Sequence, residues 1–184
     1  MREVLFVQGG GPDVHAQWDV HLVESLRRAL GAAYEVRYPP MPDEEDPRLD
    51  TWVPAIAREL ARLRPGAVVV GHSVGGTVLL HALADAPPTL GAIVLLAAPY
   101  IGEGGWESEE IAPLADLAAR LPAGVPVLLY HGDADAEVPV AHVDRYAAAL
   151  PGARVRRLAG RDHQLDDDLS EVARDLRALF PSRA

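Results

Sequence analysis

The stretch AVVVGHSVGGTVLLHALA, residues 67–84, places one polar turn, GHSVGG, between two apolar runs. The run before the turn lacks polar alternation, which is typical of a strand buried on both faces of a parallel sheet. The run after it is predicted to form a helix over residues 75–85. The turn contains the pattern G-x-S-x-G, with its serine at position 73. A strand that passes through this pattern directly into a helix is the context in which such a serine is exposed on a sharp turn.

The two glycines of the pattern, Gly71 and Gly75, remove side chains that would collide with the neighbouring strand and helix. The turn forces Ser73 into a strained backbone conformation and lifts its hydroxyl clear of the carboxyl edge of the sheet. The N–H groups of the following helix point back toward that hydroxyl, so negative charge can be stabilised there. The alternative is that Ser73 only caps the helix and that the glycines only permit tight packing.

Short apolar runs alternate with helical patterns along the whole chain. The predicted strands cover residues 4–7, 34–38, 67–70, 92–98, 125–130 and 153–158. The predicted helices cover residues 14–30, 51–64, 75–85, 112–121, 140–150 and 168–180. This alternation indicates the α/β class, with a mostly parallel six-stranded sheet between two helical layers, a three-layer α/β/α sandwich. The sixth strand alternates polar and apolar residues, which favours an edge position, and we expect the strand order 2-1-3-4-5-6.

Composition narrows the class of protein further. The 184 residues, 49% of them hydrophobic, suffice for one buried core, so we expect a single domain over 1–184. A formal charge of −10 opposes binding to nucleic acid or anionic lipid. The chain has no cysteine, which excludes disulfides and thiolate metal sites. The N-terminus lacks a secretory pattern and no apolar run could cross a bilayer, so we expect a cytoplasmic protein without membrane contact.

A serine hydroxyl is a weak nucleophile near neutral pH. The turn around Ser73, residues 71–76, which we call the elbow, therefore requires a histidine base and an acid that orients the histidine. Both should lie in loops at the carboxyl ends of later strands. The segment HGDADAEVP (131–139) offers Asp133 and Asp135, and AGRDHQLDDD (159–168) offers His163. The order serine, acid, histidine is the order found in α/β-hydrolase sheets. Spacing alone leaves the choice between Asp133 and Asp135 open.

The other histidines have structural interpretations, as caps, surface residues, helix residues or packing groups: His15, His21, His72, His81, His131 and His142. In this interpretation His72 packs the elbow and His131 braces the acid loop, residues 131–139. His163 could also be combined with Asp162 and Asp166–Asp168 as a metal site. The run DDDLS, however, is typical of an acidic helix start that complements the helix dipole. No metal and no organic cofactor is implied.

The glycine loop VQGGGPD (7–13) follows the first predicted strand and opens a helix. A dinucleotide fingerprint fails there because Val14 stands where the third glycine is needed, and Pro12 removes an amide. The chain also has no lysine for a phosphate-binding loop. The loop instead fits an oxyanion hole in which the Gly10 amide pairs with that of Val74, the residue after the serine. A tight turn without a ligand role is the alternative.

With these segments identified, the chain resembles the α/β-hydrolases, in particular the small lidless serine hydrolases of the retinoblastoma-binding-protein-nine type. The likeness spans nearly the whole chain and includes the glycine loop and the GHS of the elbow. The other shared positions are a tryptophan in the first helix, an MP pair, a W-x-P segment and G-x-x-D-x-x-x-P at the acid: Trp18, Met41, Pro42, Trp52, Pro54, Gly132, Asp135 and Pro139. Gln8 departs from the usual histidine of an HG pair, and Asp162 from the glycine that usually precedes the base.

The resemblance implies a catalytic triad of Ser73, Asp135 and His163, and it favours Asp135 over Asp133. It implies the reaction class of a serine hydrolase and little about the substrate. Our hypothesis is hydrolysis of a small ester or related acyl substrate through an acyl-enzyme, and we expect a monomer or homodimer. Residues 100–110 are too few for a cap domain, so we expect an open crevice. Its expected lining is Gly11, Tyr100 and Trp106. The rival hypothesis is a non-catalytic protein-interaction module that keeps the hydrolase fold.

Overall fold

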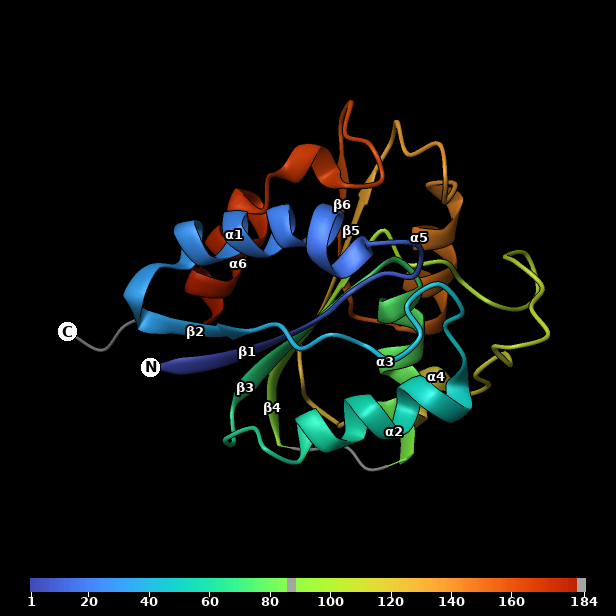
Figure 1. Ribbon diagram of the computed structural model, residues 1–184, viewed down its shortest axis with the longest axis horizontal. Coiled ribbons are helices and arrows are strands. Elements are labelled where there is room, and N and C mark those ends of the chain that lie inside the picture. The colour runs from blue at the N-terminus through green and yellow to red at the C-terminus, as the bar shows by residue number, and fades with distance from the viewer. Residues whose placement is uncertain (86–88, 182–184) are drawn as a thin grey trace.

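The computed structural model of the chain describes residues 1–85 and 89–181 (Figure 1). Within them, six parallel strands form one sheet in the order β2-β1-β3-β4-β5-β6. The strands are β1 (Arg2–Val7), β2 (Tyr34–Arg37), β3 (Ala67–His72), β4 (Leu90–Leu96), β5 (Val127–Gly132) and β6 (Arg154–Leu158). The predicted order and the edge position of the last strand are confirmed. The order reverses between β1 and β3, which opens a crevice at their carboxyl ends.

Helices cover both faces of the sheet (Figure 1). They are α1 (Asp19–Leu30), α2 (Leu49–Leu60), α3 (Ser73–Asp85), α4 (Leu117–Arg120), α5 (Ala141–Ala149) and α6 (Ser170–Leu179). Single turns of other helix types are η1 (Val14–Trp18), η2 (Gly31–Ala33) and η3 (Leu165–Asp167). The helices α1 and α6 pack on one face, whereas α2, α3 and α5 pack on the other. The arrangement is the predicted three-layer sandwich of the α/β-hydrolase fold.

The two cores divide the strand residues alternately, as the pleat of a strand requires. In β3, Val69 packs with α2 and α3, whereas Val68 and Val70 pack with α1 and α6. All three valines are fully buried. A strand that serves two cores needs apolar side chains at every position, which is why AVVV shows no polar alternation.

The predicted helix over residues 112–121 is wrong in length, because the structure has only the four residues of α4 there. Pro113 restricts the residue before it to extended backbone, and Asp116 takes a left-handed conformation with φ 53°. Both features interrupt a helix until Leu117. Residues 97–126 between β4 and β5 therefore form loops around this one turn, and the fold is compact without a cap. Among the described residues, no helix combines the length and the apolar character needed to cross a bilayer.

Candidate active site

The turn from β3 into α3 places Ser73 at the carboxyl edge of the sheet. Ser73 has φ 51°, the strained left-handed conformation expected for a serine on such a turn. A Cβ atom added to Gly71 would lie 2.4 Å from Gly76 Cα, and one added to Gly75 would lie 1.8 Å from the Gln8 carbonyl oxygen. Heavy atoms that are not bonded to each other do not approach this closely, so both positions require glycine. The elbow is packed against its own helix and against the end of β1.

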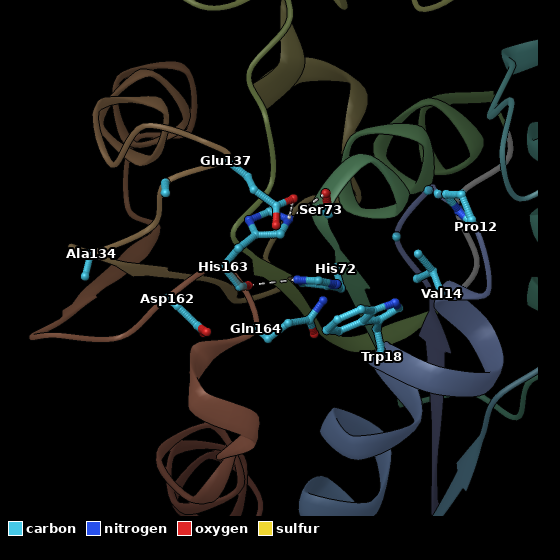
Figure 2. A pocket seen from close by; sticks show the side chains of 14 residues that line it. Pro12, Val14, Trp18, His72, Ser73, Ala134, Glu137, Asp162, His163 and Gln164 are labelled. Atoms are coloured by element: carbon cyan, nitrogen blue, oxygen red, sulfur yellow. Dashed lines mark hydrogen bonds and ion pairs between the residues drawn. The ribbon is translucent and has the colours of Figure 1, made fainter.

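The loops after β5 and β6 bring an acid and a base to this serine. His163 Nε2 lies 3.0 Å from Ser73 Oγ, and His163 Nδ1 lies 2.8 Å from Asp135 Oδ2. The imidazole of His163 faces the Ser73 hydroxyl in Figure 2. His163 is 6% exposed and the Asp135 side chain is 0% exposed, whereas Ser73 remains partly accessible. The Ser73 hydroxyl, the His163 imidazole and the Asp135 carboxylate thus form a continuous chain of hydrogen-bond distances, the arrangement that nucleophilic catalysis by a serine requires.

The Asp135 carboxylate is held by several donors besides His163. Its Oδ1 accepts the amides of Glu137 and Val138 at 2.9 and 2.8 Å. Its Oδ2 lies 3.2 Å from His131 Nε2, which also lies 2.8 Å from the Val138 carbonyl oxygen. Burial would raise the pKa of Asp135, but the hydrogen bonds from His131, His163 and the Val138 amide outweigh it, so the pKa is lowered. Asp135 therefore stays ionised.

Asp133 lies nearby but has a different partner. Its Oδ1 accepts the amide of Gly160 at 2.6 Å and so joins the acid loop to the loop after β6. The geometry thus distinguishes the two aspartates, between which the sequence spacing alone did not decide. Asp135 contacts the imidazole of His163, and Asp133 braces a turn.

The lowered pKa of Asp135 has a consequence for stability. The unfolded chain binds a proton at this carboxylate near pH 4, whereas the folded chain does not, so the contribution is present above pH 4 and is lost as the pH falls through the lower folded pKa. Between about pH 4 and pH 2, we expect the free energy of unfolding of Asp135→Asn to fall less steeply with decreasing pH than that of the wild type. The two slopes should differ by up to about 1.4 kcal/mol per pH unit, the value for one proton. Urea unfolding at several pH values measures this slope. Parallel curves for the wild type and the variant would contradict the prediction.

The glycine loop after β1 lies against the elbow. The amide of Gly9 donates to Asp19 at 2.7 Å, and that of Gly11 donates to the Glu44 carbonyl at 2.7 Å. Among the described residues, nothing accepts a hydrogen bond from the Gly10 amide between them. A Cβ atom on Gly10 would lie 2.9 Å from Val74 Cγ1, so the loop and the residue after the serine are in contact. Gly10 and Val74 therefore lie next to each other, and both line a cavity together with Ser73.

Two cavities adjoin Ser73 and His163, with volumes of about 460 and 440 Å³. Both are also lined by Gly10, Gly11 and Glu137. Figure 2 shows the first cavity, which Trp18 borders; Trp106 borders the second. Trp18 is 55% exposed and Trp106 is 40% exposed, unlike the fully buried Trp52. Exposed aromatic side chains at the borders of cavities are typical of ligand sites.

Gly11 and Trp106 line these cavities as expected, but Tyr100 does not. Its amide donates to His142 Nδ1 at 2.8 Å, and its ring packs edge-on against Tyr146 at 5.1 Å between centroids. These contacts turn Tyr100 toward a much smaller cavity of about 20 Å³, between α3 and α4.

Acidic side chains line the second cavity, and none of the arginines that the structure describes lines either one. The carboxylates of the second cavity are those of Glu45, Asp46, Glu107, Glu110 and Glu137. Of these five, Asp46 pairs with Arg48 at 3.8 Å, so the lining carries an excess of negative charge beside the serine. Among the described residues, no group of three or more histidine or acidic side chains is placed to hold a metal ion. In the run considered for metal binding, Asp162 Oδ1 instead accepts the amide of Asp166 at 3.0 Å.

The sequence patterns did not identify one buried pair in the site, that of Asp19 and His72. The two residues come from different elements, the start of α1 and the end of β3, and their carboxylate and imidazole are 2.9 Å apart. A carboxylate next to a π-helical turn is not part of any motif. Asp19 lies inside the helix predicted over residues 14–30 and begins a helix, α1, only in the structure, so no sequence pattern singled out the pair.

The profile of the serine hydrolase family matches residues 8–168. No curated protein sequence matches the chain. Among solved structures, the chain is similar to the meta-cleavage product hydrolase of Pseudomonas fluorescens IP01, with 16% identity, a TM-score of 0.76 and coverage of 98% of this chain and 90% of that one. The esterase RhEst1 of Rhodococcus sp. ECU1013 has 17% identity, a TM-score of 0.75 and coverage of 100% and 91%. The ydeN gene product of B. subtilis has 19% identity, a TM-score of 0.72 and coverage of 98% of this chain and 99% of that one.

Proposed function

The chain belongs to the serine hydrolase family, and on that premise we propose that it cleaves a small ester or related acyl substrate with Ser73, His163 and Asp135 as its catalytic triad. The observation that carries the proposal is the unbroken set of hydrogen-bond distances from Ser73 Oγ through the imidazole of His163 to the Asp135 carboxylate. That the chain is a hydrolase follows from its family. We further propose that the chain is a single domain and that it is similar to the retinoblastoma-binding-protein-nine type. The catalytic triad and the type of bond that is cleaved are proposals as well.

In the first half of the reaction, Ser73 Oγ attacks the acyl carbonyl carbon while His163 Nε2 takes the hydroxyl proton. The carbon–oxygen bond to the alcohol then breaks, and the alcohol leaves with the proton held by His163. In the second half, a water molecule gives a proton to His163 and its oxygen attacks the acyl-enzyme. Ser73 is released with its proton, and the carboxylic acid departs. Asp135 keeps the imidazole oriented and stabilises its charged form throughout.

The negative charge that develops on the carbonyl oxygen needs donors close to Ser73. The amides of Gly10 and Val74 serve this role in the proposal, because Gly10 contacts Val74 and because the amides on either side of Gly10 are already in use. Backbone donors of this kind cost no reorganisation during the reaction. Each contributes about 3 kcal/mol to transition-state stabilisation in comparable sites.

Turnover of short-chain p-nitrophenyl esters by the purified chain tests the proposal. We expect saturable hydrolysis that a stoichiometric fluorophosphonate abolishes. The rival hypothesis, an interaction module that keeps the fold, predicts a rate no greater than that of a Ser73→Ala, His163→Ala double variant. A folded wild-type chain that hydrolyses no ester, thioester, lactone or amide of a broad panel would favour that rival.

The acidic lining of the second cavity predicts a preference for uncharged substrates. Mono-p-nitrophenyl succinate has an acyl chain as long as that of p-nitrophenyl butyrate, but it carries a carboxylate that the glutamates repel. We expect kcat/KM to be at least about tenfold lower for the succinate at low salt, and the ratio to shrink as salt screens the charges.

Two variants identify the origin of that preference. The double variant Glu107→Gln, Glu110→Gln is expected to lower the ratio of kcat/KM for the butyrate to kcat/KM for the succinate, because both residues line the second cavity. Glu24→Gln is the matched control, since this exposed residue of α1 pairs only with Arg28 among the described residues. Equal ratios in all three proteins would show that the cavity carboxylates do not select the substrate.

A further inference from the structure

Asp19 and His72 are a buried titratable pair that the hydrolytic mechanism does not use. Asp19 is 0% exposed and His72 is 1% exposed. The Nδ1 atom of His72 lies 2.9 and 3.0 Å from the two carboxylate oxygens of Asp19. Its Nε2 atom lies 3.0 Å from the backbone carbonyl oxygen of His163, the contact drawn as a dashed line in Figure 2. The ring therefore lies between α1 and the loop that carries the catalytic base.

The partners of this ring determine its protons. A carbonyl oxygen only accepts hydrogen bonds, so Nε2 must carry a proton to bind His163. An ionised carboxylate also only accepts, so Nδ1 must carry a second one. The amide of Gly9 donates to Asp19 Oδ2 at 2.7 Å and so favours the ionised carboxylate over the protonated acid. With a proton on both nitrogens, His72 is a buried imidazolium.

The electrostatics of the pair agree with that assignment. Burial would lower the pKa of His72, but the neighbouring Asp19 outweighs it and the pKa is raised. Burial would raise the pKa of Asp19, but His72 and the Gly9 amide outweigh it and the pKa is lowered. The charged or titratable groups that face His72 are Asp19 from α1 and His163 from the loop after β6, with Asp135 from the loop after β5 acting over a longer distance.

We propose that His72 is a positioning residue, an imidazolium whose two N–H groups tie Asp19 to the backbone of the catalytic base His163. The inference rests on the proposed function insofar as His163 is that base. The same pair holds the Gly9 amide, next to the proposed oxyanion donor Gly10. A single buried ion pair thus links the glycine loop, the residue before the nucleophile and the loop after β6 that carries His163. A neutral His72 has one N–H group and would have to release one of its two partners.

Two amide variants separate the two hydrogen bonds. In His72→Gln the amide nitrogen can take the place of Nε2 and keep the bond to the His163 carbonyl. In His72→Asn it takes the place of Nδ1 and keeps the bond to Asp19. Both variants remove the same charge and the same ring. We expect kcat to fall about 10- to 100-fold for His72→Asn and less than about fivefold for His72→Gln, with KM changing less than about threefold in both, because a small displacement of the base is costly.

The protonation of the ring is measured directly, and independently of turnover. With ¹⁵N-labelled histidine, the wild-type chain should show one imidazole with both nitrogens protonated at about pH 8, where an unperturbed histidine is neutral. That signal should be absent from His72→Gln and should become a neutral imidazole in Asp19→Asn. A neutral His72 in the wild type at that pH would overturn the proposal, as would equal losses of kcat in the asparagine and glutamine variants. Absence of wild-type turnover with a doubly protonated His72 would instead contradict the proposed hydrolysis.

Discussion

Replacing Ser73 with alanine is expected to lower kcat for p-nitrophenyl butyrate by about 10⁶-fold, because the attacking oxygen is removed and water must react without a covalent intermediate. The methyl group of alanine fits the elbow, so the fold and the two cavities should persist and the affinity for substrate should change little. Initial rates over a range of substrate concentrations measure both quantities. Circular dichroism and the midpoint of thermal unfolding serve as the control for folding. A folded variant that keeps more than about 1% of the wild-type rate would place the nucleophile elsewhere.

Replacing His163 with alanine is expected to have an effect of similar size, because a serine without its base is almost wholly protonated and unreactive. Nucleophile and base act as a unit, so the double variant should be no slower than either single variant. His21→Ala is the matched control, since His21 lies exposed on α1 and outside the site. Losses that multiply in the double variant would mean that the two side chains act independently.

Much of the fold could be predicted because its strands are buried on both faces. A run such as AVVV has no polar position, and only a parallel sheet with helices on both sides buries such a strand. The elbow was predictable for a related reason, because glycines at positions 71 and 75 are needed where backbone approaches within the reach of a Cβ atom. The two loops that supply Asp135 and His163 followed from chain order once the sheet was assigned.

Other features depend on contacts that leave no local pattern. A helix was predicted over residues 112–121, but the structure has only α4 there, because Pro113 and the left-handed Asp116 interrupt the helix. Tyr100 follows β4 at the correct edge, yet its amide donates to His142 and its ring packs against Tyr146. The pair of Asp19 and His72 is 53 positions apart in the sequence. Such a pair becomes visible only when α1 and β3 are placed side by side.

The reactivity of one hydroxyl, that of Ser73, distinguishes a serine hydrolase with this triad from a fold that has lost its activity. A fluorophosphonate phosphonylates a serine that a neighbouring base has activated, so the purified chain should take up one equivalent of the probe. Intact mass and peptide mass spectrometry are expected to locate that adduct on Ser73, with labelling lost in both Ser73→Ala and His163→Ala. A folded wild-type chain that remains unlabelled, or that carries the probe on another residue, would contradict the assignment of Ser73 as the nucleophile.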